Sequence, residues 1–121
     1  MPKHNINEFD QLFRRTIKEL AGATSPHRIK LDRIDAKTLR LLTHVTVENK
    51  TLTYTKCRIG INNGGNDHYL DELENPAANE LVVSRSDILL GEGDVFFAEL
   101  TDTVADQELV MTCIGWEKNL I

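Results

Sequence analysis

Glycines with the spacing of nucleotide-binding loops are the first sign of chemistry in this sequence. In LLGEGDVFF, residues 89–97, Gly91 and Gly93 match the first two positions of the dinucleotide-binding fingerprint. Phe96 stands where a third glycine has to pack a helix against a strand, and the residues around it have the pattern of a strand. We therefore expect residues 91–94 to be a corner between two strands, and we expect no nucleotide and no other cofactor.

Metal binding is the second chemistry that the residue types allow, because acidic side chains gather in one short segment. Carboxylate oxygens are the ligands that hard cations prefer, but the segment lacks the regular alternation of a calcium-binding loop. The histidines of the chain are scattered, without the spacing of a zinc-binding helix. A solvated acidic loop is therefore favoured over a metal site for the cluster Asp67, His68, Asp71, Glu72 and Glu74.

Nucleophilic catalysis has its residue types in the chain but not its usual sequence pattern. A serine, a histidine and an acid have to converge in space, and the candidates are Ser84, Ser86, His44 and Asp87. No nucleophile-elbow signature surrounds either serine. The sequence therefore favours a protein that is not an enzyme.

The two cysteines, Cys57 and Cys113, lie in strand-like segments at positions that are expected to face inward. Free buried thiols that act as small apolar side chains are the favoured interpretation. A disulfide would need the two strands to be neighbours, which the sequence leaves open.

Length and charge restrict the kinds of protein that this chain can be. With 121 residues it is long enough for one domain with a core. A net charge of −5 argues against binding nucleic acid through its phosphates, which needs a basic surface. No apolar run is long enough to cross a membrane, so no membrane partner is expected. The opening MPKHNINEFD lacks the apolar stretch of a secretory signal, so synthesis in the cytoplasm is expected.

An amphipathic helix is predicted near the start of the chain, over residues 6–21. Asn5 and Glu8 fit an N-cap with its capping-box partner, and Gly22 supplies a stop. Apolar residues recur at spacings of three and four, which places them on one face of a helix. This face has to pack on the protein's own sheet or dock on a partner, and it consists of Ile6, Phe9, Phe13, Ile17 and Leu20.

After a breaker segment, the apolar pattern changes to a period of two, which is typical of strands. We predict an antiparallel, jelly-roll-like β-sandwich of about seven or eight strands over residues 28–121, after an arm and linker over 1–27. Residues 48–51 are expected to form a tight hairpin turn, 62–67 a glycine turn, and 68–79 a connection. The strand-like segments are 28–35, 38–48, 51–61, 80–90, 95–101 and 108–117. Within 38–48, the predicted inward face consists of Leu39, Leu41, Thr43, Val45 and Val47.

Four stretches follow one another along the chain: LRLLTHVTVENKT, CRIGINNGGNDHYL, ILLGEGDVFFAEL and ELVMTCIGWE. In order and spacing they resemble the first long strand with its hairpin, the glycine-rich tip, the strand–corner–strand unit and the closing strand of a small β-sandwich domain. That domain is common among virion structural proteins of tailed bacteriophages. The opening HRIKLDRIDAKT departs from the Pro-Ala-Gly turn that this family more often has, which leaves the place of the first strand open.

A further stretch, EFDQLFRRTI over residues 8–17, resembles the N-terminal segment of phage head–tail joining proteins. Both likenesses imply a non-enzymatic virion protein: a head–tail connector, a tail adaptor or a capsid-decorating subunit. Such a protein is made in the host cytoplasm, forms a homo-oligomer, and binds other virion proteins of the capsid, portal or tail. The residues expected to bind these partners are the helix face Ile6, Phe9, Phe13, Ile17 and Leu20, together with Trp116.

A carbohydrate- or receptor-binding β-sandwich is the alternative function. It would need a groove with exposed aromatic side chains, for which Tyr54, Tyr69 and Trp116 are the candidates. The chain has one Trp, two Tyr and four Phe residues, and several of them are needed in the core and the helix. The supply of aromatic side chains for such a groove is therefore small.

Overall fold

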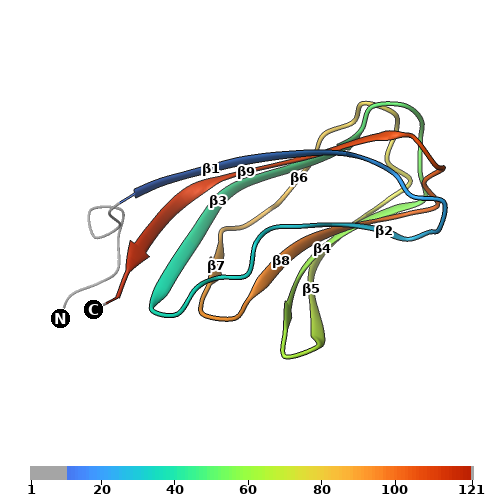
Figure 1. The fold of residues 1–121 in the computed structure, drawn as a ribbon. Coiled ribbons are helices and arrows are strands. Elements are labelled where there is room, and N and C mark those ends of the chain that lie inside the picture. Colours follow the sequence, from blue (N-terminus) through green and yellow to red (C-terminus); the bar gives the residue numbers. More distant parts are fainter. Residues whose placement is uncertain (1–10, 121) are drawn as a thin grey trace.

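Two antiparallel β-sheets pack face to face in the computed structural model, which describes residues 11–120 (Figure 1). Sheet A has the strand order β1-β9-β3-β6, with β7 also pairing with β3, and sheet B has the order β2-β8-β4-β5. No helix in this described part is long and apolar enough to cross a membrane. The strands are β1 (Gln11–Leu20), β2 (His27–Lys30), β3 (Thr38–Asn49), β4 (Lys56–Asn63), β5 (Asn66–Glu74), β6 (Val82–Val83), β7 (Ile88–Leu90), β8 (Val95–Thr101) and β9 (Glu108–Asn119).

Most connections carry the chain from one sheet to the other, as in a jelly roll. The prediction of an all-β fold with two antiparallel sheets is therefore confirmed. One apolar core lies between the sheets, and both sheets contribute to it: Ile29 and Leu100 come from sheet B, and Leu42 and Met111 from sheet A. Removing such side chains from water is the main favourable contribution to folding.

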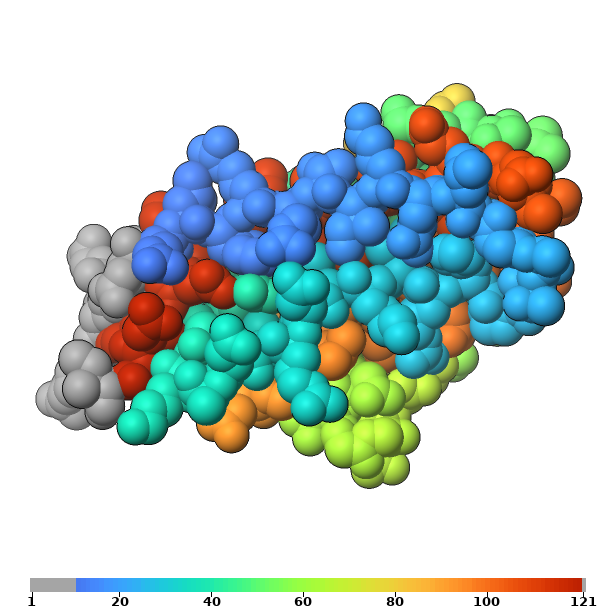
Figure 2. Space-filling view, viewed as in Figure 1, coloured from blue at the N-terminus to red at the C-terminus, as the bar shows by residue number. Residues whose placement is uncertain are grey.

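The helix predicted over residues 6–21 is wrong where the structure describes it, because residues 11–20 form strand β1. This strand pairs with β9 along its whole length and appears in blue along one border of the molecule (Figure 2). A spacing of four residues fits both kinds of element, since it is about one helical turn and also two strand repeats. Phe13 and Ile17 therefore face the core from a strand as they would from a helix. An isolated short helix is marginal in water, whereas β1 gains a ladder of hydrogen bonds to β9.

Strand β3 changes face in its middle. Its register with β9 shifts between Leu42 and His44, so that Thr43 is accommodated in a β-bulge. Gly115 allows the close approach of the two strands there, because a Cβ atom at this position would lie 1.8 Å from the Leu41 carbonyl oxygen. The predicted inward face is therefore correct only after the bulge: Val45 and Val47 are buried, but before it Arg40 and Leu42 are buried in place of Leu39, Leu41 and Thr43.

The tight hairpin predicted at residues 48–51 is wrong, because β3 belongs to sheet A and β4 to sheet B. The segment after β3 crosses between the sheets, and Asn49 fixes its start. The buried Asn49 amide nitrogen donates to Gln107 Oε1 (2.8 Å), and its oxygen accepts from the Thr51 N–H (2.8 Å). The turn residues at 48–51 thus begin a crossing from sheet A to sheet B and do not form a hairpin within one sheet.

The glycine turn predicted at residues 62–67 is confirmed as the hairpin between β4 and β5. Asn63 pairs with Asn66, and between them Gly64 and Gly65 have φ of 61° and 84°, as a primed hairpin turn requires. The connection predicted over 68–79 is wrong in its first part, because β5 continues to Glu74. The acidic residues of β5 interrupt the alternation of apolar residues by which a strand is recognised in a sequence.

The corner predicted at residues 91–94 is confirmed between β7 and β8. The Asp94 carboxylate accepts a hydrogen bond from the Gly91 N–H (2.8 Å) and another from the Asn63 amide (2.7 Å). This carboxylate therefore closes a turn and ties it to the neighbouring β4–β5 hairpin.

Candidate interaction surfaces

The residues predicted to bind partners do not share one face in the structure. Phe13 is buried and Ile17 is half-buried against the core, whereas Leu20 at the end of β1 is 60% exposed. Ile6 and Phe9 lie outside the described residues. The described residues of the predicted helix face are thus divided between the core and the surface.

Trp116 lies within an apolar row on the outer face of sheet A. The register places Leu12 of β1 and Leu41 of β3 on either side of Trp116, and Leu89 of β7 beyond Leu41. Each of these four residues follows or precedes a buried residue in its strand, so its side chain points away from the core. Leu12 is 48% exposed and Leu89 is 58% exposed. We call Leu12, Trp116, Leu41 and Leu89 the apolar row.

The two long borders of the sandwich, where the edges of the sheets face each other, are closed to different extents. At the border formed by β1 and β2, the Arg15 guanidinium lies 3.3 Å from the Asp32 carboxylate, and the His27 ring lies 2.7 Å from the Glu19 carboxylate. Both pairs join β1 to the chain around β2, and the centroid of the buried Phe13 ring lies 5.9 Å from the Arg15 guanidinium carbon. We call this the closed border.

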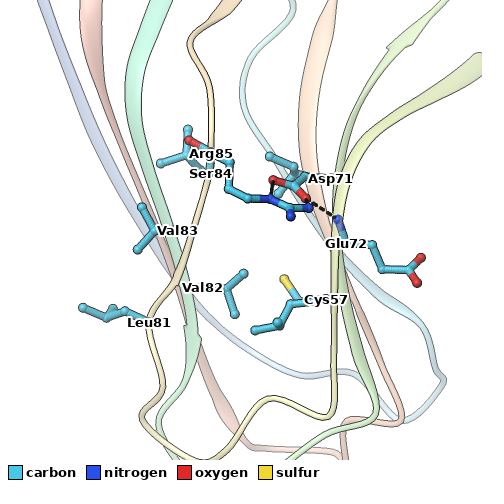
Figure 3. Close-up of a pocket in the computed structure, with 11 residues that line it drawn as sticks. Cys57, Asp71, Glu72, Leu81, Val82, Val83, Ser84 and Arg85 are labelled. Atoms are coloured by element: carbon cyan, nitrogen blue, oxygen red, sulfur yellow. Dashed lines mark hydrogen bonds and ion pairs between the residues drawn. The ribbon is translucent and has the colours of Figure 1, made fainter.

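At the opposite border, between β5 and the chain around β6, a groove enters the space between the sheets (Figure 3). It consists of two adjoining cavities of about 200 Å³ and about 230 Å³. In Figure 3, Cys57 of β4 and Val82 of β6 lie on facing sides of it. We call this the open groove, and its apolar lining includes Val45, Cys57, Ile59, Leu73, Leu81 and Val82.

One ion pair crosses the open groove. Arg85, which follows β6, donates to both carboxylate oxygens of Asp71 on β5, with Nε 3.0 Å from Oδ2 (Figure 3). The same two side chains line both cavities, so the pair divides the groove. Hydrogen bonding by Arg85 holds the pKa of the Asp71 carboxyl below its ordinary value. The Arg85 side chain is 78% exposed, and such a pair adds little to the stability of the fold.

Arg28 ties β5 to the rest of sheet B on its outer face. Its guanidinium stacks on the Phe97 ring at 3.8 Å and donates to Asp67 (3.0 and 3.1 Å) and to Glu99 (2.7 Å). Tyr69 of β5 packs edge-on against Phe97, with 5.7 Å between ring centroids. Hydrogen bonding by Arg28 lowers the pKa of Asp67 to about 2. The outer edge strand is therefore held by charge and by aromatic contact.

The acidic segment considered for metal binding is divided among separate ion pairs. No group of three or more potential metal ligands occurs among residues 11–120. Arginines on other strands and loops neutralise part of the segment, in the pairs Arg28–Asp67 (3.0 Å), Arg58–Glu72 (2.9 Å) and Arg85–Asp71.

The residues considered for nucleophilic catalysis lie on different surfaces. Ser84, Ser86 and Asp87 line the open groove, whereas His44 pairs with Ile114 on the outer face of sheet A. The structure does not bring the histidine to the serines.

Cys57 and Cys113 are free and buried, which confirms the favoured interpretation. They lie in different sheets, Cys57 on β4 and Cys113 on β9. Burial raises the pKa of the Cys57 thiol to about 11 and that of Cys113 to about 12. Because the thiolate is the reactive form, neither cysteine is an activated nucleophile.

The three aromatic residues considered for carbohydrate binding are far from forming one platform. Tyr54 is 4% exposed, and burial raises the pKa of its hydroxyl. Tyr69 lies on the outer face of sheet B, and Trp116 lies on the outer face of sheet A. The structure therefore does not provide the expected groove from these residues.

The open groove is a feature that the sequence analysis missed, because β3, β4, β5 and residues 81–85 all contribute to its lining. The sequence does contain one indication of an open border. ELVVSRSDILL has a polar interruption between two apolar runs, and in the structure this interruption separates β6 from β7. An edge that is broken in this way leaves part of the sandwich uncovered.

Comparisons with known proteins identify the fold but no family. No family model matches the chain, and no curated protein matches it. A structure from the disulfide-linked pili that form Bacillus endospore appendages is similar at 12% identity, with a TM-score of 0.51, over 92% of this chain and 88% of that chain. The chain thus shares its two-sheet β fold with that protein.

Two further solved structures are similar at lower TM-scores. The Podospora anserina GH26-CBM35 β-(1,4)-mannanase has 12% identity and a TM-score of 0.42, over 84% of this chain and 27% of that chain. A structure of the infectious bursal disease virus Gx strain has 11% identity and a TM-score of 0.35, over 100% of this chain and 43% of that chain. At these scores neither likeness bears on the function of this chain.

Proposed function

We propose that this protein is a non-enzymatic structural subunit of a tailed-bacteriophage virion: a head–tail connector, a tail adaptor or a capsid-decorating protein. It acts by docking on other virion proteins and on copies of itself, with no chemical turnover. The observation that carries this proposal is the apolar row on the outer face of sheet A, where Leu12 and Leu89 are exposed beside Trp116 and Leu41.

The apolar row has the composition of a protein-binding surface. An aromatic side chain lies between aliphatic ones, and aromatic residues are enriched where interfaces are fully buried. In the neighbouring rows of the same face, Arg14 pairs with Ile114 and Lys118 pairs with Leu39, so both charged and apolar side chains border the patch. Because paired strands hold these side chains, binding costs little backbone ordering.

The fold is compatible with repetitive assembly. The Bacillus appendage protein that shares it forms disulfide-linked pili. In this chain both cysteines are buried and free, so the contacts that we propose are non-covalent. The resemblance of the four sequence stretches to tailed-phage domains supports a virion as the particle.

The first test is whether purified virions contain the protein. Particles are induced from the strain whose genome carries the gene, purified on a density gradient, and analysed by quantitative mass spectrometry against the major capsid protein. We expect a fixed number of copies in each particle. Absence from purified particles would contradict the proposed role.

The second test is whether the apolar row is the docking surface. Particles that lack the protein are incubated with purified Leu12→Ser/Leu89→Ser protein, and we expect its occupancy to fall by about tenfold or more. The matched control is Leu52→Ser/Val104→Ser, whose residues are 56% and 60% exposed and lie in loops away from the row. Equal occupancy of the two variants would show that the row is not the docking surface.

A further inference from the structure

Within residues 11–120, the sandwich has four sheet edges, and two of them are long. An unpaired edge presents a row of backbone donors and acceptors that another strand can use. In sheet B one edge is β2, with 4 residues, and in sheet A one edge is broken into β6 and β7, with 2 and 3 residues. The other two edges are β1, with 10 residues, and β5, with 9 residues. Short or broken edges are poor templates, so β1 and β5 are the edges able to pair.

The two long edges carry opposite charge. Arg14, Arg15 and Lys18 outweigh Glu19 on β1, which gives residues 11–20 a net charge of +2. The residues of β5 carry a net charge of −4 from Asp67, Asp71, Glu72 and Glu74, although the first three form ion pairs with arginines of the same subunit. A basic edge is unusual in a chain whose total charge is −5.

We infer that the edge of β1 in one copy pairs with the edge of β5 in the next copy, so that sheet A of one subunit continues sheet B of its neighbour. Two β1 edges repel each other through Arg14 and Lys18, whereas these cations are attracted to the acidic side chains of β5. The charges thus favour the pairing that joins unlike edges. This inference rests on the proposed role as a repeated structural subunit, and it names a second copy of this chain as the partner.

The positions of the two edges determine the kind of assembly that results. β1 and β5 belong to different sheets and lie at opposite borders of the sandwich (Figures 1 and 2). A contact between them is head-to-tail, so every assembly still offers one free β1 edge at one end and one free β5 edge at the other. Such contacts build a ring if the rotation closes and an open chain if it does not.

The contact also covers surface that is exposed on the single subunit. The outer edge of β5 borders the open groove, and Leu70 and Leu73 on this strand are 47% and 36% exposed. An added strand would pair with the backbone of β5 and shield these side chains at the mouth of the groove.

Two variants test the inference, and each changes the charge of one of the two edge strands. Arg14→Glu/Lys18→Glu changes the net charge of β1 from +2 to −2. Glu72→Lys/Glu74→Lys changes that of β5 from −4 to 0 and also removes the Arg58–Glu72 ion pair. By analytical ultracentrifugation we expect wild-type protein to form oligomers, and each variant alone to associate roughly tenfold or more weakly. Oligomers of the wild type should become smaller as sodium chloride rises from about 50 mM to about 500 mM, because salt screens the charges.

Mixing the two variants gives the decisive result. The β1-reversed protein retains a native β5, and the β5-reversed protein retains a native β1, so the mixture contains one native contact and no means of extending it. We expect a 1:1 heterodimer that grows no further. Dimers of the β5-reversed protein alone would indicate a β1–β1 contact. Dimers of the β1-reversed protein alone would indicate a β5–β5 contact. Either result would overturn the inference.

Matched controls separate the edge charges from the total charge. Arg33→Glu/Lys37→Glu and Asp35→Lys/Glu92→Lys make the same changes in total charge at exposed loop positions. Both are expected to assemble as the wild type does, and circular dichroism melting checks that all variants are folded. A wild type that stays monomeric at low salt would overturn the β1–β5 contact while leaving the virion test unaffected. Absence from virions together with β1–β5 oligomers would contradict only the proposed role.

Discussion

The closed border and the open groove are two solutions to the same structural problem. At both borders of the sandwich, the apolar faces of two sheets have to be separated from water. At the closed border, a continuous strand of 10 residues carries the buried Phe13, and the pairs Arg15–Asp32 and Glu19–His27 span the gap. At the open groove, strands of 2 and 3 residues leave cavities, which the pair Arg85–Asp71 crosses.

The difference shows that strand continuity matters more than the number of ion pairs. Ion pairs occur at both borders, but in sheet A only the continuous edge strand β1 places a large buried side chain in the gap, whereas the edge broken into β6 and β7 does not. Apolar residues also face the open groove, among them Val82 and Leu73, yet Leu73 remains 36% exposed. The closed border is therefore expected to contribute stability, and the open groove to be the more easily opened border.

The largest expected difference between the borders is in the cost of removing an apolar side chain. Phe13→Ala at the closed border should lower the free energy of unfolding by about 3 kcal/mol or more, because it leaves a cavity in the core. Val82→Ala at the open groove should cost only about 1 kcal/mol, since the space there is already accessible. Urea unfolding of both variants gives the two values, and equal losses would contradict the comparison.

Acid should loosen the β5 side of the molecule through Asp67. Its pKa in the folded protein is about 2, below the ordinary 3.8, because Arg28 hydrogen-bonds to the charged carboxylate. The stabilisation is therefore present above about pH 4 and is lost as the pH falls toward about 2. Asp67→Asn should be less stable than wild type near neutral pH, and the gap should close by about pH 2. Urea midpoints measured across this range test it, and a gap that is independent of pH would refute the assignment.

The smallest expected effect is on the reactivity of the two cysteines. Arg85→Gln removes the ion pair across the open groove, and we expect alkylation of Cys57 by iodoacetamide to become about two- to fivefold faster. Cys113 lies in β9, away from the groove lining, and its alkylation should not change. Peptide mass spectrometry measures both rates in one sample. Arg33→Gln is the control, and equal acceleration of both cysteines would indicate global destabilisation.

The sequence alone determined the features that depend on local pattern. The alternation of apolar residues predicted strand segments that overlap β2, β3, β4 and β6 to β9, but it missed β5. The strand β8 over residues 95–101 was predicted with its observed bounds. The turns at 62–67 and 91–94 followed from glycine, asparagine and aspartate, whose backbone preferences act within a few residues. The buried, free state of the two cysteines followed from the same alternation.

Only the tertiary structure decided what depends on the partner of each strand. The stripe at Phe13 and Ile17 fits both a helix and a strand, and pairing with β9 selects the strand. The bulge at Thr43 reverses the face of β3, because β3 has to match β9 where Gly115 permits close approach. The apolar row and the open groove each combine side chains from several strands. Local pattern sets which side chains alternate, but the hydrogen-bonding partner of a strand sets which sheet it joins and what lies beside it.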